Sequence, residues 1–155
     1  MSTVKKYNSI LKNNVPVLIQ ETQWESKSTV ISSPKKVDDF VRNVLKLNQM
    51  TEEYLYMIAC NAKTEILGIF EISHGSVNEA YVSPREIYMK ALLIGASVII
   101  LIHNHPSQDT APSEADLLIT ERIKKGGMLL GVELMDHIII GSDYYSMKEN
   151  KLIED

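Results

Sequence analysis

The spacing of apolar side chains predicts an alternation of helices and strands from residue 34 onward. Ser33-Pro34 is a helix start, because an N-cap serine precedes a proline at the first helical position. The apolar positions that follow recur every three to four residues, as on one face of a helix; they are Val37, Phe40, Val41, Val44 and Leu45. This pattern predicts a helix that ends near Asn48.

Two apolar segments, residues 53–60 and 66–72, then predict a pair of strands joined by a polar turn. Residues 79–82 are a candidate third strand. Ser83-Pro84-Arg85-Glu86 has the pattern of a capping box with proline at the first helical position. It predicts a second helix that reaches about Gly95.

The second half of the chain continues this alternation. Residues 97–102 are nearly all apolar, as in a central strand covered on both faces. A third helix is predicted to begin at Ser113 and to stop at Gly126-Gly127, since glycine is common at helix C-caps. Residues 134–140 and 144–147 are the last expected strands. The order of elements predicts a single-domain α/β sandwich, in which helices flank a mixed β-sheet.

Residues 1–33 are expected to be an N-terminal extension ahead of the domain at residues 34–155. Residues 15–19 and 29–31 have the pattern of short strands, and Trp24 between them is available to anchor a hairpin. We therefore expect strands that pack on the edge of the domain.

Composition narrows the class of protein. The 155 residues are 45% hydrophobic and 23% charged, as in an ordinary soluble domain with a proper core. The net charge of −4 argues against a surface built to bind nucleic-acid phosphates. The one cysteine, Cys60, cannot form an internal disulfide, and no apolar run approaches the roughly 20 residues of a membrane span. Without a signal-peptide pattern, we expect a cytoplasmic protein.

The stretch from His103 to Asp116 carries the candidate chemistry. His103 and His105 stand one residue apart, and side chains at i and i+2 of an extended chain point the same way. Asp116 follows a turn-rich loop at the start of a predicted helix. Two imidazoles and one carboxylate form a three-ligand set that leaves a fourth position for water, which is the pattern of a catalytic zinc site.

The same residues resemble the metal motif of a known family. His103-Asn104-His105-Pro106, followed by Ser113 and Asp116 in a Ser-x-x-Asp, is similar to the motif of the JAB/MPN (JAMM) superfamily of zinc isopeptidases. The form of the motif resembles the RadC branch. Residues 82–87, residues 136–141 and a glutamate that opens a strand, Glu53, fit that branch as well.

The likeness spans about residues 34–147, and it implies a cytidine-deaminase-like sandwich with Zn²⁺ bound by His103, His105 and Asp116. One residue departs from the branch, because RadC proteins usually have glycine where this chain has Gln108. No ligand position is affected.

The resemblance also implies the catalytic residues. In JAMM enzymes a glutamate at the start of the strand after the first helix accepts a proton from the metal-bound water, and Glu53 occupies this place. Glu71, on the neighbouring strand, is the alternative base, whereas Glu52 is expected to point to the opposite face. Ser113 resembles the serine that donates to the tetrahedral oxyanion. Seen alone, Ser113 and Asp116 would be an ordinary helix cap, and both roles can hold for different atoms.

Three further polar residues have two interpretations each. Asp109 is either a partner of a metal-binding histidine or a turn former. For His137 a structural hydrogen bond is favoured over support of a ligand. His74 is a candidate for lining the cleft, and its place is left open.

The leading hypothesis is a zinc-dependent hydrolase of peptide or isopeptide bonds that acts on a peptide or protein substrate. One alternative is a DNA-repair or recombination factor of the RadC type, which the acidic charge disfavours. Another is a non-catalytic MPN binding module. A zinc nucleoside deaminase is excluded, because its site needs His-x-Glu with a Cys-x-x-Cys pair and the chain has one cysteine. Neither substrate nor oligomeric state follows from the sequence.

Overall fold

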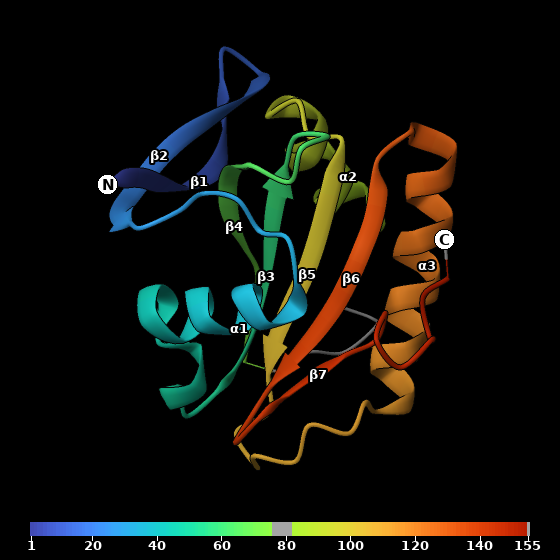
Figure 1. The fold of residues 1–155 in the computed structure, drawn as a ribbon. Helices are drawn as coiled ribbons and strands as arrows, with labels where there is room; N and C mark the ends of the chain where they lie inside the picture. The colour runs from blue at the N-terminus through green and yellow to red at the C-terminus, as the bar shows by residue number, and fades with distance from the viewer. Residues whose placement is uncertain (76–81, 155) are drawn as a thin grey trace.

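The computed structural model describes residues 1–75 and 82–154, and these form one mixed β-sheet with helices on both faces (Figure 1). The strands are β1 (Ser2–Lys12), β2 (Val15–Ser26), β3 (Glu53–Cys60), β4 (Ile66–Gly75), β5 (Val98–Asn104), β6 (Glu133–Ile140) and β7 (Tyr144–Ser146). Their order is β2-β1-β4-β3-β5-β6-β7. The β5–β6 and β1–β4 pairs are parallel and the others antiparallel, which confirms the predicted α/β sandwich with a mixed sheet.

The helices α1 (Pro34–Phe40), α2 (Pro84–Leu93) and α3 (Glu114–Leu130) divide between the two faces of the sheet. Alternate residues of a strand point to opposite faces. On β3, Leu55 and Met57 pack in the core shared with α2 and α3, whereas Tyr56 and Ile58 pack in the core shared with α1. In Figure 1, α1 lies in front of the sheet and α2 behind it. The central strand β5 is fully buried, as its apolar sequence predicts.

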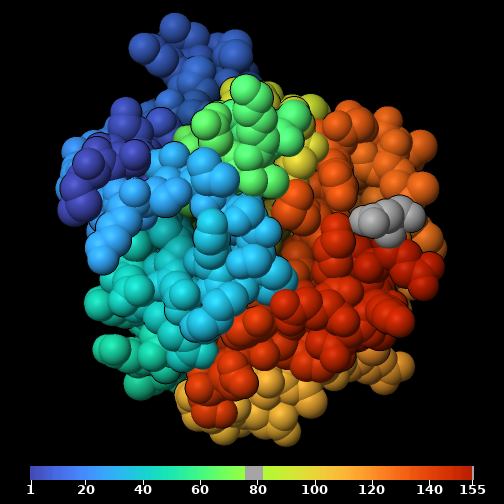
Figure 2. Space-filling model, in the orientation of Figure 1, coloured from blue at the N-terminus to red at the C-terminus, as the bar shows by residue number. Residues whose placement is uncertain are grey.

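The N-terminal segment is more regular than its sequence suggests. β1 and β2 form a long hairpin that pairs over its whole length, so the expected strand at residues 15–19 is only the first part of β2. Residues 29–31 contribute only an isolated bridge between Val30 and Glu65. The hairpin projects from the body of the molecule (Figure 2).

The first helix is shorter and less regular than predicted. An α-helix ends at Phe40, five residues in π-helical form follow (Val41–Leu45), and then a 3-10 turn, Leu47–Gln49. Lys46 adopts a left-handed conformation (φ 55°), which breaks the helical path before the predicted end. The apolar face is nevertheless correct, since Val37, Phe40 and Val41 are buried.

The predicted capping box at Ser83 is wrong. Ser83 is the N-cap of α2, but its side chain caps no backbone amide, and Glu86 forms an ion pair with Arg85 instead. The candidate strand at residues 79–82 falls mostly on residues 79–81, which lie outside the described part of the chain; Val82 is buried but not in a strand.

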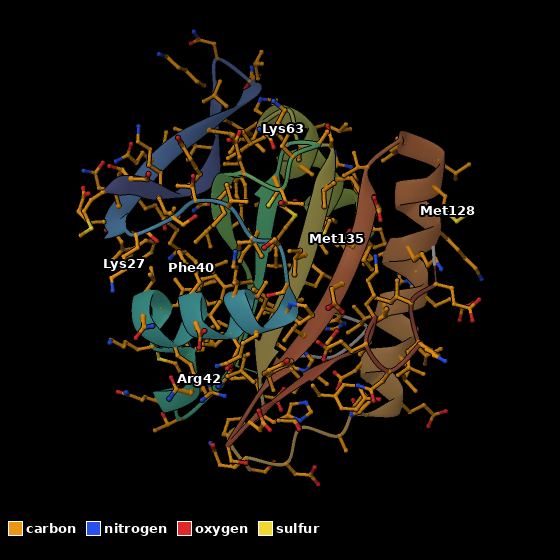
Figure 3. All side chains as sticks on the ribbon, viewed as in Figure 1. Lys27, Phe40, Arg42, Lys63, Met128 and Met135 are labelled. Carbon is orange, nitrogen blue, oxygen red and sulfur yellow. The ribbon has the colours of Figure 1, made fainter. Side chains whose placement is uncertain are left out.

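The predicted end of the third helix at Gly126-Gly127 is also wrong, because α3 continues to Leu130 and ends with Gly131 in the left-handed conformation. The two earlier glycines have another purpose. A Cβ on Gly126 would lie 2.9 Å from the Tyr88 ring, and one on Gly127 would lie 2.1 Å from the Val132 carbonyl oxygen. They therefore permit close packing rather than mark a helix end. Farther along α3, Met128 points away from the sheet (Figure 3).

No helix in the described part of the chain is long and apolar enough to cross a membrane.

Candidate metal centre

Three potential ligand side chains converge at the end of β5. The Nε2 atoms of His103 and His105 lie 3.0 Å apart, and each lies 3.2 Å from a different carboxylate oxygen of Asp116. In a tetrahedral zinc site with bonds near 2.0–2.1 Å, neighbouring ligand atoms are separated by about 3.3 Å. One ligand atom from each of the three residues lies within 4.8 Å of the others, so the predicted ligands are brought close enough together to hold one metal ion.

The alternation of β5 explains why the two histidines face Asp116. Ile99 and Leu101 pack on the side of α2 and α3, and His103 continues this series. The strand extends to Asn104, two residues beyond the predicted end, so His103 lies on the rigid central strand itself. Asp116 stands in the first turn of α3 and is buried. A strand end and a helix start therefore supply the ligands together.

Ser113 is the N-cap residue of α3. Its Oγ accepts a hydrogen bond from the Asp116 amide at 3.1 Å, and Asp116 Oδ2 accepts one from the Ser113 amide at 2.8 Å. This is a capping box, as the sequence pattern alone suggested. The box also fixes the Asp116 carboxylate beside the histidines. Because Ser113 Oγ is the acceptor in this pair, its hydroxyl hydrogen stays available for another acceptor.

His105 is oriented by the loop that follows it. Its Nδ1 lies 2.7 Å from the carbonyl oxygen of Asp109, and a carbonyl can only accept, so Nδ1 carries a hydrogen. Nε2, which faces Asp116, is then left to bind a cation, either a proton or a metal ion. The Asp109 carboxylate accepts from the Ala111 amide at 3.0 Å. Asp109 thus contacts a candidate ligand through its backbone carbonyl and forms a turn through its carboxylate.

The electrostatics of the cluster favour a cation between its members. The hydrogen bond with Asp116 raises the pKa of His105; burial opposes this rise, and the Asp109 carbonyl and the attraction of Glu53 add to it. Burial by itself would raise the pKa of Asp116, but hydrogen bonds from His103 and His105 outweigh it and lower that pKa well below its ordinary value. Asp116 is therefore a buried carboxylate anion beside two imidazoles.

His137 and Thr120 lie directly behind the ligands. His137 Nε2 is 2.8 Å from His103 Nδ1, and His137 Nδ1 is 2.7 Å from Thr120 Oγ1. Burial lowers the pKa of His137 well below its ordinary value, and repulsion from His103 adds to this. His137 thus contacts a candidate ligand, which the sequence suggested only as the less favoured alternative. Thr120 was missed, although its position four residues after Asp116 on a helix puts both on one face.

The two candidates for the base, Glu53 and Glu71, and the neighbouring Glu52 lie in different places. β3 pairs with β5 so that Leu55 is opposite His103, and Glu53, the first residue of β3, lies two residues before Leu55 on the same face of the strand. Glu71 contacts the Tyr56 hydroxyl at 3.5 Å, and the Tyr56 side chain packs on the α1 side of the sheet. The Glu52 carboxylate contacts the His74 ring. Of the three, only Glu53 stands on the side of the cluster, half-buried.

Asn104, between the two histidines, holds the segment that carries Glu53. Its amide nitrogen donates to the Glu52 carbonyl at 2.9 Å, and its amide oxygen accepts from the Tyr54 backbone at 2.8 Å. These bonds continue the β3–β5 ladder through a buried side chain. His74 stacks on Tyr54 at 4.1 Å between ring centroids and is not part of the metal cluster.

The arrangement matches a known family. Residues 31–152 match the model of the RadC-like JAB domain. The chain belongs to the RadC-like JAB family. Among curated relatives of this family, a UPF0758 protein of Alkaliphilus metalliredigens is 44% identical over 121 residues, which are 76% of this chain and 52% of that protein.

Two other UPF0758 proteins give the same picture. One from Clostridium acetobutylicum is 43% identical over 82% of this chain and 55% of its own length. One from Methanosarcina mazei is 37% identical over 86% of this chain and 58% of its own. The chain thus spans about half the length of the curated RadC-like relatives that it matches.

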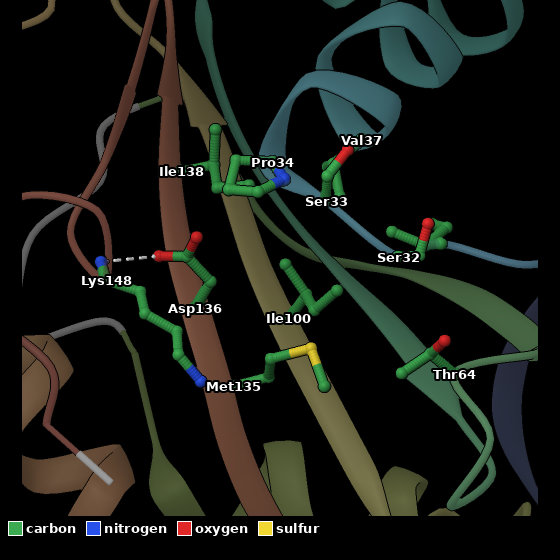
Figure 4. Close-up of a pocket in the computed structure, with 11 residues that line it drawn as sticks. Ser32, Ser33, Pro34, Val37, Thr64, Ile100, Met135, Asp136, Ile138 and Lys148 are labelled. Atoms are coloured by element: carbon green, nitrogen blue, oxygen red, sulfur yellow. Dashed lines mark hydrogen bonds between the residues drawn. The ribbon is translucent and has the colours of Figure 1, made fainter.

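A cavity of about 270 Å³ lies apart from the candidate metal centre, on the α1 side of the sheet (Figure 4). Asp136 and Met135 of β6 line it, together with Ser33 and Pro34 at the start of α1. The Asp136 carboxylate is satisfied within the fold, since it accepts from the backbone amides of His137 and Lys148 and from the Ser146 hydroxyl. We assign no chemistry to this cavity.

Proposed function

We propose that this chain is a zinc-dependent hydrolase of peptide or isopeptide bonds. The observation that carries the proposal is the convergence of His103, His105 and Asp116, whose nearest nitrogen and oxygen atoms lie 3.0–3.2 Å apart, with Glu53 at the start of the neighbouring strand β3. The ligand set leaves one tetrahedral position open, as catalytic zinc sites do. A zinc ion supplies Lewis acidity, which lowers the pKa of a water molecule and polarises a carbonyl group.

The side chains around this position have separate tasks in the proposal. Glu53 accepts a proton and delivers it to the leaving amine, as a carboxylate general base does. Asn104 holds the backbone on both sides of Glu53, so that the carboxylate stays at the end of β3. Ser113 donates its available hydroxyl hydrogen to the oxygen that becomes negative in the transition state, which is worth about 3 kcal/mol in comparable sites.

The proposed substrate is a peptide or protein, because the donor set is the one that the JAB superfamily uses for amide bonds and the site lies at the molecular surface, where His105 is partly exposed. The net charge of −4 does not favour nucleic acid as the partner.

Elemental analysis of the purified protein tests the metal site. We expect near one zinc per chain in the wild type and little in Asp116→Ala and in the double variant His103→Ala/His105→Ala. Asp116→Asn is a sharper variant, since its amide oxygen can still accept from the Ser113 amide and maintain the cap. His74→Ala is the matched histidine control and should keep the zinc.

A wild type that neither contains zinc nor takes it up from added zinc salt would overturn the hydrolase proposal. The family's non-catalytic binding modules would then be the better comparison. If zinc is present, a peptide and isopeptide library analysed by mass spectrometry gives the substrate class.

A further inference from the structure

A chain of hydrogen bonds runs from the backbone of α3 to the candidate ligand His103. Thr120 Oγ1 lies 2.7 Å from the Asp116 carbonyl oxygen and 2.7 Å from His137 Nδ1. His137 Nε2 in turn lies 2.8 Å from His103 Nδ1. Thr120 and His137 are buried, so these bonds form without competition from solvent. The proposed mechanism uses neither residue.

The direction of each bond follows from the number of hydrogens. A carbonyl oxygen has none, so the short Thr120–Asp116 contact needs the threonine hydroxyl hydrogen. Thr120 has only that one hydrogen, and Met147 Sδ, 3.2 Å from Oγ1, is a weaker acceptor for it than the carbonyl oxygen. Toward His137 the hydroxyl can then only accept. His137 Nδ1 therefore carries a hydrogen.

The same reasoning continues to the ligand. His137 is enclosed without a bonded carboxylate among the described residues, which disfavours a second proton on its ring. Its Nε2 is then an acceptor, so His103 must donate from Nδ1. The remaining nitrogen of His103, Nε2, is the one that faces Asp116 and His105.

We infer that Thr120 and His137 are positioning residues that hold His103 in the tautomer whose Nε2 lone pair points at the metal. The inference rests on the proposed zinc site and adds which residues hold His103 in the ligand form. The backbone carbonyl of Asp109 accepts a hydrogen bond from His105 Nδ1 and so holds His105 in the same tautomer. For His103 the acceptor is His137 Nε2, and the Thr120 hydroxyl fixes the tautomer of His137. Groups behind a metal-bound histidine commonly change metal affinity by about 10–100-fold.

Zinc affinity measured by competition with a chelating dye tests the inference. Thr120→Val keeps the shape and removes the hydroxyl, and we expect its zinc dissociation constant to rise by about 10-fold or more. Thr120→Ser retains a hydroxyl, and its zinc dissociation constant should lie within about threefold of that of the wild type. Equal affinities of wild type and Thr120→Val would overturn the inference while leaving the zinc site intact. A loss in both variants would indicate a packing role and overturn it as well.

Histidine tautomers in the wild type give a second readout that needs neither substrate nor zinc. Long-range ¹H–¹⁵N correlation spectra of the protein in chelator at about pH 8 should show His137 as a neutral ring protonated on Nδ1. A hydrogen on Nε2 of His137 would reverse the direction of these hydrogen bonds and overturn the inference. If the wild type shows the expected tautomer but binds no zinc, the hydrogen-bond chain stands and the proposed function fails.

Discussion

The backbone of Gly141 lies so close to Gln108 that a Cβ on the glycine would come within 2.6 Å of the Gln108 carbonyl oxygen. Gly141 follows β6, whereas Gln108 lies in the loop between the candidate ligands His105 and Asp116. The next residue, Ser142, also reaches this carbonyl, with its amide and its hydroxyl each at 3.4 Å. The turn after β6 therefore supports the loop that carries His105.

We expect Gly141→Ala to displace this loop. The new methyl group would meet the Gln108 carbonyl oxygen at 2.6 Å and the Thr110 methyl group at 2.7 Å, and the carbonyl oxygen cannot move without shifting the chain. The free energy of unfolding should fall by about 1–3 kcal/mol, and zinc affinity should fall with it. Urea unfolding and dye competition measure both. Ser142→Ala is the control, because it keeps the backbone amide contact and removes only the long, exposed hydroxyl contact; it should change stability by no more than about 0.5 kcal/mol.

Gln108→Gly should stabilise the protein. Gln108 has a φ of 72°, in the left-handed region that favours glycine. Relief of this strain is expected to raise the free energy of unfolding by about 1 kcal/mol, after the greater freedom of glycine in the unfolded chain is counted. Gln108→Ala retains the Cβ, so it should show no such gain in thermal or urea unfolding. A glycine variant less stable than the alanine variant would contradict the strain argument.

Glu53→Gln should keep the zinc and lose hydrolysis, because it removes the proposed base and leaves the three ligands in place. The loss in kcat is expected to be about 10²-fold or more. Glu71→Gln is the matched control, since Glu71 contacts Tyr56 on the other side of the sheet. Zinc content and turnover of a library-derived peptide are measured for both. Full activity in Glu53→Gln with loss in Glu71→Gln would move the base to Glu71.

Asp136→Asn should change how stability depends on pH. Burial raises the pKa of Asp136, although hydrogen bonds from Ser146 and from two backbone amides oppose the rise. The folded protein then holds this proton to a higher pH than the unfolded chain. The resulting stabilisation is complete below the unfolded pKa and is lost as pH rises through the folded pKa, at about 1.4 kcal/mol per unit of difference.

Urea unfolding of both proteins from about pH 4 upward measures this contribution, because the asparagine has no proton to lose. The wild type should lose stability relative to Asp136→Asn as the pH rises. Parallel curves would show that the carboxyl group titrates alike in both states.

Much of the fold follows from local patterns. The buried strand β5 and the apolar face of α1 could be predicted because period-2 and period-3.6 spacing directly reflects burial. The end of α3 could not, because Gly126 and Gly127 serve contacts with Tyr88 and Val132 that are distant in sequence. The length of the strands in the N-terminal hairpin could not be predicted, because β2 has many exposed polar residues and little apolar alternation.

The candidate site was predictable where neighbours in sequence are neighbours in space. His103, His105 and Asp116 fall within fourteen residues, and their grouping in space agrees with their spacing. His137, which contacts His103, lies on β6, a strand distant from β5 in sequence. Its local sequence therefore did not distinguish it from a core histidine. Asn104 was overlooked because its partners, Glu52 and Tyr54, are about fifty residues earlier.

The place of the N-terminal hairpin in the sheet has a consequence for dynamics. β1 joins the remaining strands only along β4, where Lys6 pairs with Ile69, and Tyr7 rests against Phe70 at 6.1 Å between ring centroids. β3 and β5, in contrast, are each enclosed by strands on both sides. Amide hydrogens of β1 and β2 should therefore exchange through opening of the hairpin alone, whereas those of β5 should wait for global unfolding. We expect a range of temperature in which the hairpin frays while the strand that carries His103 remains closed.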